Sequence, residues 1–128
     1  MSRAVVILEH SGHGPVHYDL MLEQEGAALA TWQLDRVPGD LAAGESAPAR
    51  KLPDHRRVYL AFEGPVSRGR GQVRRVEAGT YELLGAEEGL WQVRFAGAAL
   101  AGLFELRRVG PPADAWELRR LSDPAPAR

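Results

Sequence analysis

Residues 10–23 read HSGHGPVHYDLMLE and contain three of the four histidines of the chain. From Val16 onward the residues alternate strictly between two sets, and this period of two is typical of a strand with one buried face. His17 and Asp19 are therefore predicted to project from one face, while Tyr18 and the two leucines project from the other.

His10 and His13 precede this strand across a turn that contains two glycines and a proline. Such a turn lets the chain fold back, so that one of these two histidines lies over His17 and Asp19. Two imidazoles and a carboxylate suit manganese, iron, zinc or nickel, and three protein ligands leave positions open for water or a substrate oxygen. The pattern predicts a site for metal-assisted hydrolysis. The structural alternative is that the histidines only cap the turn and that the aspartate fixes a histidine tautomer.

The composition is that of one small globular domain. The 128 residues are 45% apolar and 26% charged, which suits a single hydrophobic core. There is no cysteine, so disulfides, thiolate metal sites and a cysteine nucleophile are excluded. The net charge of -1 gives no bulk attraction to nucleic acid, and any polyanion site must therefore be local.

No signal-peptide core and no apolar run of membrane-spanning length is present, so we expect a cytoplasmic monomer without membrane contact. We expect one domain over residues 1–121 and a flexible tail over residues 122–128.

Short apolar segments separated by Gly and Pro turns are typical of an all-β sandwich or small barrel. A helix is the alternative for residues 27–34 because alanine is plentiful there. We expect a long loop over residues 35–53, a turn at residues 78–79, and a bulge or bend at Gly102. The expected strands are residues 4–8, 16–23, 27–34, 58–63, 72–77, 80–84, 90–95, 99–109 and 116–121. The expected core residues are Trp91, Phe95, Leu103, Phe104, Trp116 and Leu118.

Residues 50–57, RKLPDHRR, form the densest basic segment, and its His55 stands four residues before Tyr59. Arginine offers two parallel donors to a phosphate, and histidine or tyrosine can donate to a phosphoryl oxygen. The glycines of residues 64–71 let backbone N–H groups approach an anion. These features predict a phosphate pocket, and the alternative is a solvated arginine-rich loop. The candidate phosphate-binding cations are Arg50, Lys51, Arg56 and Arg68.

The histidines and their neighbours form two sequence signatures, one after the other along the chain. The first joins VILEH at residues 6–10 to HYDLMLE at residues 17–23, with Trp32 following. The second joins Asp54 and His55 to Tyr59 and to FEG at residues 62–64. Further motifs are GTYE at 79–82, the glycine-rich run at 97–104 and WEL at 116–118. Together, over residues 5–123, they resemble the 3′-phosphoesterase domain found at the N-terminus of bacterial DNA ligase D and in stand-alone homologues.

The resemblance implies an all-β fold, a compact β-barrel of about eight short strands with minor helical elements. It implies the removal of a 3′-phosphate or a 3′-terminal ribonucleotide from primer-template DNA in end repair, with a separate DNA ligase or polymerase as candidate partner. The implied cofactor is Mn2+ or a similar divalent metal such as Zn2+ or Co2+. The implied metal ligands are His10, His17 and Asp19, and the implied contacts to the scissile phosphate are His55 and Tyr59.

The chain departs from the family pattern at two places. The family arginine two residues after the aspartate is Met21 here, which removes a guanidinium. His10 and His17 stand seven positions apart, one more than is usual in the family, so either the loop carries an insertion or His13 replaces His10. Two rival functions remain: a catalytically weak or inactive metal-containing module that binds nucleic-acid ends or a ligase, and a hydrolase for a different phosphoester.

Overall fold

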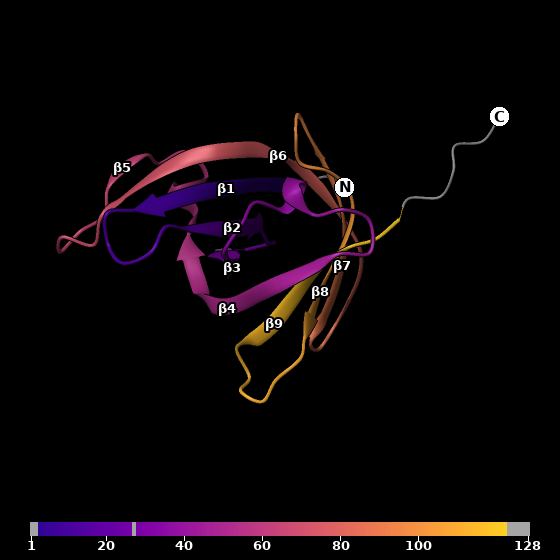
Figure 1. Ribbon diagram of the computed structural model, residues 1–128. Coiled ribbons are helices and arrows are strands. Elements are labelled where there is room, and N and C mark those ends of the chain that lie inside the picture. The colour runs from indigo at the N-terminus through magenta and orange to yellow at the C-terminus, as the bar shows by residue number, and fades with distance from the viewer. Residues whose placement is uncertain (1–2, 27, 123–128) are drawn as a thin grey trace.

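The computed structural model describes residues 3–26 and 28–122, and its strands form a closed antiparallel barrel (Figure 1). The sheet order is β1-β2-β3-β4-β9-β8-β7-β6, β1 closes the barrel by pairing with β6, and β5 pairs with β6 outside it. The expected all-β barrel with minor helical elements is thus confirmed. The strands are β1 (Arg3–Ser11), β2 (His17–Glu23), β3 (Ala28–Leu34), β4 (Ser46–Arg56), β5 (Gly64–Pro65), β6 (Gln72–Glu87), β7 (Leu90–Gly97), β8 (Ala101–Arg108) and β9 (Ala115–Arg120), and the short 3-10 helices are η1 (Pro38–Asp40) and η2 (Arg57–Leu60).

The expected loop over residues 35–53 is wrong in its second half, because β4 begins at Ser46. Ala47 and Ala49 are buried against the barrel interior, and β9 pairs with this part of β4. Pro48 is tolerated because β3 ends opposite Ala49, so the proline lies where one side of β4 has no partner strand.

The expected strand over residues 58–63 is also wrong, because η2 occupies residues 57–60. Tyr59, Leu60 and Phe62 pack on an apolar cluster of the barrel's outer wall instead of joining the sheet.

Residues 72–84 belong to one long strand rather than two. Gly79 allows a close approach to β7, because a Cβ there would lie 2.6 Å from the carbonyl oxygen of Ala96. β8 keeps its register through Gly102, so the expected bulge is absent from these pairings. Residues 28–34 are a strand, and the helical alternative is wrong.

The main core fills the barrel. Trp32 is fully buried, and its ring contacts those of Trp91 and Trp116 edge to face at 5.3 and 5.5 Å. Of the expected core residues, Phe95, Phe104, Trp116 and Leu118 are buried in this cluster, and Trp91 packs against it. Leu103 is only partly buried and belongs to neither core cluster of the described residues, because it alternates with the inward Phe104.

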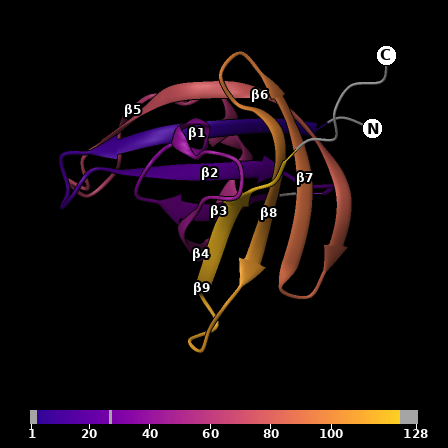
Figure 2. The ribbon, with the colours of Figure 1, turned by 45° about the vertical axis from the view of Figure 1, so that its right-hand side comes forward.

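A second apolar cluster lies on the outer face of the wall formed by β6, β1, β2 and β3. Its buried members are Val6, Leu8, Met21, Leu29 and Val73. They are covered by side chains of residues 57–66, which we call the cover segment. Figure 2 shows the wall from another side. This part of the sheet is thus buried on both faces.

No helix among the described residues is long and apolar enough to cross a membrane. The expected flexible tail, residues 122–128, lies outside the described residues from 123 onward.

Candidate metal centre

The candidate ligands come from the first two strands of the barrel. His10 of β1 is paired directly with His17 of β2, and Asp19 is opposite Leu8. Since alternate residues share a face, all three side chains project from the outer wall, as the alternation in the sequence predicts for His17 and Asp19. Their ligand atoms lie within 4.8 Å of one another. The arrangement offers two nitrogen donors and one oxygen donor to a cation.

Asp19 is a buried carboxylate with one oxygen that lacks a partner among the described residues. Its side chain is buried, with 4% of the residue exposed, and Oδ1 has no hydrogen-bond partner among the described residues. Burial raises the pKa of this carboxyl group, and the histidines around it, His17 first, oppose that rise. Oδ1 lies 3.4 Å from His17 Nε2, and Oδ2 lies 3.9 Å from His10 Nδ1. A divalent cation would satisfy the unpaired oxygen and would suit neutral imidazole and carboxylate ligands.

His10 has a fixed tautomer that suits this role. Its Nε2 lies 2.6 Å from the backbone oxygen of Arg70, and because a carbonyl only accepts, Nε2 must carry the proton. In the neutral imidazole Nδ1 is then unprotonated, and it is the nitrogen that faces Asp19. Histidines that ligate metals commonly donate their other N–H to a carbonyl in this way. Nε2 of His10 thus has the structural role of a hydrogen bond to the turn, and Nδ1 is left free to bind a metal.

The turn that supplies this carbonyl depends on Gly71. A Cβ at Gly71 would lie 2.1 Å from the backbone oxygen of Ser11, and its φ is +80°. Only glycine lets the turn approach the end of β1 so closely. His13 is exposed in the loop between β1 and β2 and is outside the ligand group of the described residues. The structure thus brings His10, rather than His13, together with His17 and Asp19.

His55 and Tyr59 reach the same site from the other side. The register of β3 against β4 shifts just before His55, and such bulges redirect side chains. His55 Nδ1 donates to the carbonyl oxygen of Pro53 at 2.9 Å, and its ring lies 5.8 Å from that of Tyr59. A cavity of about 90 Å³ is lined by His10, Asp19, Met21, His55, Tyr59, Val66, Arg70 and Val73.

The predicted cations differ in where they lie. Arg50 is on the outer face, opposite Gln33, and pairs with Asp114 at 3.3 Å. Lys51 faces the opposite way, with Nζ 5.1 Å from the centre of the Trp32 ring. Arg56 lies over Tyr59 at 5.9 Å, and Arg68 is exposed in the turn before β6.

Sequence reasoning missed Arg70, which lines the cavity and donates through its guanidinium to the backbone and hydroxyl oxygens of Ser67. The signal lay in the glycine-rich basic turn, but only the pairing of β1 with β6 places that turn beside His10.

Met21 lies on the ligand face, two residues after Asp19, and is buried to 1% exposure. Its thioether lines the cavity and packs in the outer cluster. The position where the resemblance implies an arginine is thus apolar here.

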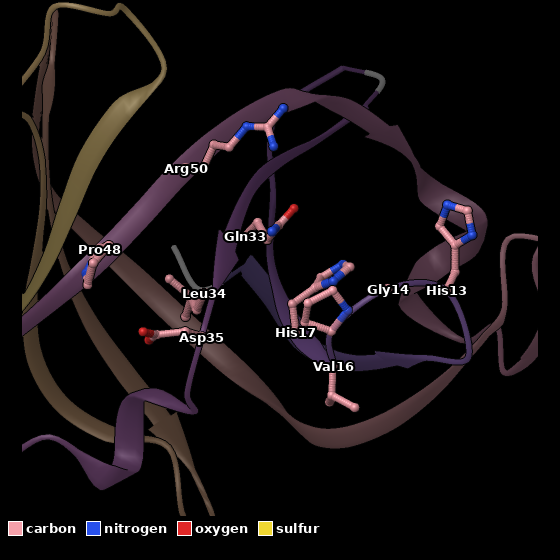
Figure 3. A pocket seen from close by; sticks show the side chains of 10 residues that line it. His13, Gly14, Val16, His17, Gln33, Leu34, Asp35, Pro48 and Arg50 are labelled. Atoms are coloured by element: carbon pink, nitrogen blue, oxygen red, sulfur yellow. The ribbon is translucent and has the colours of Figure 1, made fainter.

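A groove of about 640 Å³ extends from the ligand face across β3 to β4. Figure 3 shows His17, Gln33 and Arg50 on three neighbouring strands along it, with His13 set apart on the loop. Pro48 and Arg50 also line the next hollow, of about 430 Å³, beside β9. The ligand face therefore opens on this side to an extended surface with an arginine on it.

Residues 9–108 match the model of the family described as DNA ligase D 3′-phosphoesterase domain. That range contains the three candidate ligands together with His55, Tyr59 and Arg70. No curated protein matches the chain.

Proposed function

Because the chain belongs to the DNA ligase D 3′-phosphoesterase domain family, we propose that it is a divalent-metal-dependent phosphoesterase that trims 3′-phosphate and 3′-ribonucleotide ends of DNA. The observation that carries the proposal is the grouping of His10 and His17 with the buried Asp19, whose Oδ1 has no hydrogen bond among the described residues. His55 and Tyr59 line the same cavity as His10 and Asp19. The proposed substrate is a primer-template end, and a separate ligase or polymerase would use the product.

In this proposal His10, His17 and Asp19 hold the metal, with Mn2+ as the expected ion. When bound, such an ion polarises a phosphoryl oxygen and lowers the pKa of water. The cover segment partly encloses the cavity beside these ligands through Tyr59 and Val66. This enclosure limits the access of bulk water and strengthens electrostatic interactions with a phosphate.

His55 is our candidate for the proton donor to the leaving oxygen. Its Nδ1 donates to Pro53, so Nε2 is left to hold and release a proton. The hydroxyl of Tyr59, on the same cavity, can donate to a phosphoryl oxygen. These two side chains are our candidates for the contacts to the scissile phosphate.

The groove over β2, β3 and β4 is our candidate path for the DNA strand that leads to the site. Arg50 projects from its far wall and can contact a backbone phosphate. Met21 supplies no guanidinium to the cavity, but Arg70 lines the same cavity. Arg70 is therefore our candidate for the cation beside the scissile phosphate.

The second candidate function is a module that binds nucleic-acid ends without turnover. It is favoured by Met21, because burial of an apolar side chain at this position removes a donor from the phosphate-facing side of β2.

The test is Mn2+-dependent processing of primer-templates that carry a 3′-phosphate or a single 3′-ribonucleotide. We compare the parent with H17A and H55A, and expect at least a hundredfold loss in each variant, because H55A removes the candidate general acid and H17A removes a candidate metal ligand. Only H17A should also lose Mn2+ binding, whereas H13A should retain it.

Processing that survives in both H17A and H55A would refute the assigned site. A parent that binds Mn2+ and the DNA end without processing it would establish the binding module instead.

A further inference from the structure

A second hollow adjoins the cavity of the candidate metal centre. It has a volume of about 270 Å³ and is lined by Arg56, Val58, Tyr59 and Phe62. Tyr59 lines both spaces, so a molecule bound in the hollow lies next to the site of phosphate chemistry. The groove that extends toward Arg50 adjoins the same centre through His17 and does not share Tyr59.

The lining of this hollow has the chemistry that binds a nucleobase. The ring of Tyr59 meets that of Phe62 at 5.6 Å and 86°, and the guanidinium of Arg56 lies 5.9 Å above the Tyr59 ring. Nucleobases stack on aromatic rings and on guanidinium planes regardless of base identity. No acidic side chain lines the hollow among the described residues, so nothing there repels an adjoining phosphate.

Val58 completes the wall and is exposed to 54%. An apolar side chain at this exposure is not needed for the core, and it gives a base an apolar surface to lie on. Three of the four lining residues belong to the cover segment, and Arg56 ends β4. Tyr59 and Phe62 also pack on the outer apolar cluster, so that packing fixes their positions in the hollow.

The sizes of the two spaces indicate which part of a substrate each one takes. The groove and its continuation beside β9 measure about 640 and 430 Å³, which suits several nucleotides of a strand. The hollow is just below the range of about 300 Å³ and upward that holds drug-sized ligands, which suits one nucleoside.

We propose that the hollow formed by Arg56, Val58, Tyr59 and Phe62 binds the 3′-terminal ribonucleoside that is released from the DNA end. The inference rests on the proposed function. In the reaction, the oxygen of water bonds to phosphorus, the bond from phosphorus to the 5′-oxygen of the terminal nucleoside breaks, and that oxygen gains a proton. The products are a 3′-phosphate on the strand and a free nucleoside in the hollow. Removal of the 3′-phosphate has no nucleoside leaving group and does not use the hollow.

The test compares two substrates in one protein. V58D places a carboxylate in the hollow, where it repels the substrate and pairs with the guanidinium of Arg56. L84D is the matched control, because Leu84 is exposed to 46% on β6 and lines none of these spaces. We expect V58D to slow nucleoside release about tenfold while 3′-phosphate removal stays within about twofold of the parent, and L84D to change neither. A tenfold loss equals about 1.4 kcal/mol, within the contribution of one stacked base.

An equal loss of both reactions in V58D, or no loss of nucleoside release, overturns the proposal. If the parent processes neither end, the proposed function fails. The binding of DNA ends to the metal-free protein then tests the inference separately. A primer-template with a 3′-terminal ribonucleoside should then bind about tenfold more tightly than one that ends in the preceding 3′-hydroxyl, and V58D should abolish that difference. Equal affinities of the parent for the two ends overturn the inference.

Discussion

Replacement of Asp19 by asparagine should invert the order of stability between metal-free and metal-loaded protein. In the metal-free protein, Oδ1 is buried without a hydrogen bond, which costs about 1–3 kcal/mol. The amide nitrogen of asparagine can donate to His17 Nε2, which lies 3.4 Å from Oδ1. We therefore expect metal-free D19N to be about 1 kcal/mol more stable than the parent at neutral pH, or about 3–5 °C higher in Tm.

The pH dependence of the metal-free protein should have the same cause. Burial raises the pKa of Asp19 in the folded state, so the folded protein binds more protons than the unfolded chain, and stability falls as the pH rises from the ordinary carboxyl range through the raised pKa. D19N should not show this loss of stability with rising pH, because asparagine does not titrate.

Metal should reverse the comparison. At an Mn2+ concentration of about 100 Kd, a site formed only in the folded state stabilises the parent by about 2.7 kcal/mol, or about 10 °C in Tm, whereas D19N has lost its anionic ligand. The measurement is thermal unfolding followed by circular dichroism in EDTA and in Mn2+, with D40N as an exposed control. If D19N is less stable than the parent in EDTA, or gains as much from Mn2+, the assignment of Asp19 as an unpaired ligand is refuted.

Two further predictions concern the supports of the site. G71A should weaken Mn2+ binding about 10–100-fold by displacing the carbonyl that orients a ligating histidine, and calorimetric titration should show G69A, in open space at a similar φ, unchanged by comparison. The pKa of Glu23 is held below its ordinary value by the N–H of Ala4 and then by Arg57, so its stabilising contribution is present above about pH 4.5 and is lost as the pH falls through the lowered pKa. Urea unfolding between pH 6 and 3 should therefore show a shallower loss of stability in E23Q, and an unchanged slope would contradict this assignment.

The sequence predicted best what depends on local pattern. The alternation around His17 placed that side chain and Asp19 on one face because the side-chain period of a strand is a property of consecutive residues. β4 was missed because its first half is built from serine, alanine and proline, and its strand character comes from pairing with β3 and β9.

The parts of the site that sequence reasoning left open are set by the register and partners of the strands. The position of His10, rather than His13, beside His17 follows from the register of β1 against β2. The proximity of Arg70 follows from the pairing of β1 with β6, which joins segments about sixty residues apart. The Gly and Pro turn predicted that the chain folds back before His17 but not the register of the pairing, and no spacing argument relates β1 to β6.

The closure of the barrel limits how another chain can attach to it. A strand that already has a neighbour on each side offers no row of free backbone groups to an incoming peptide. The ninth strand outside the closure is only Gly64–Pro65, too short to act as a template and lacking one N–H because of its proline. A ligase or polymerase that associates with this protein by strand addition would thus find only short one-sided stretches, in β4 and at the end of β6, so we expect recognition to depend mainly on side chains in the hollows and turns.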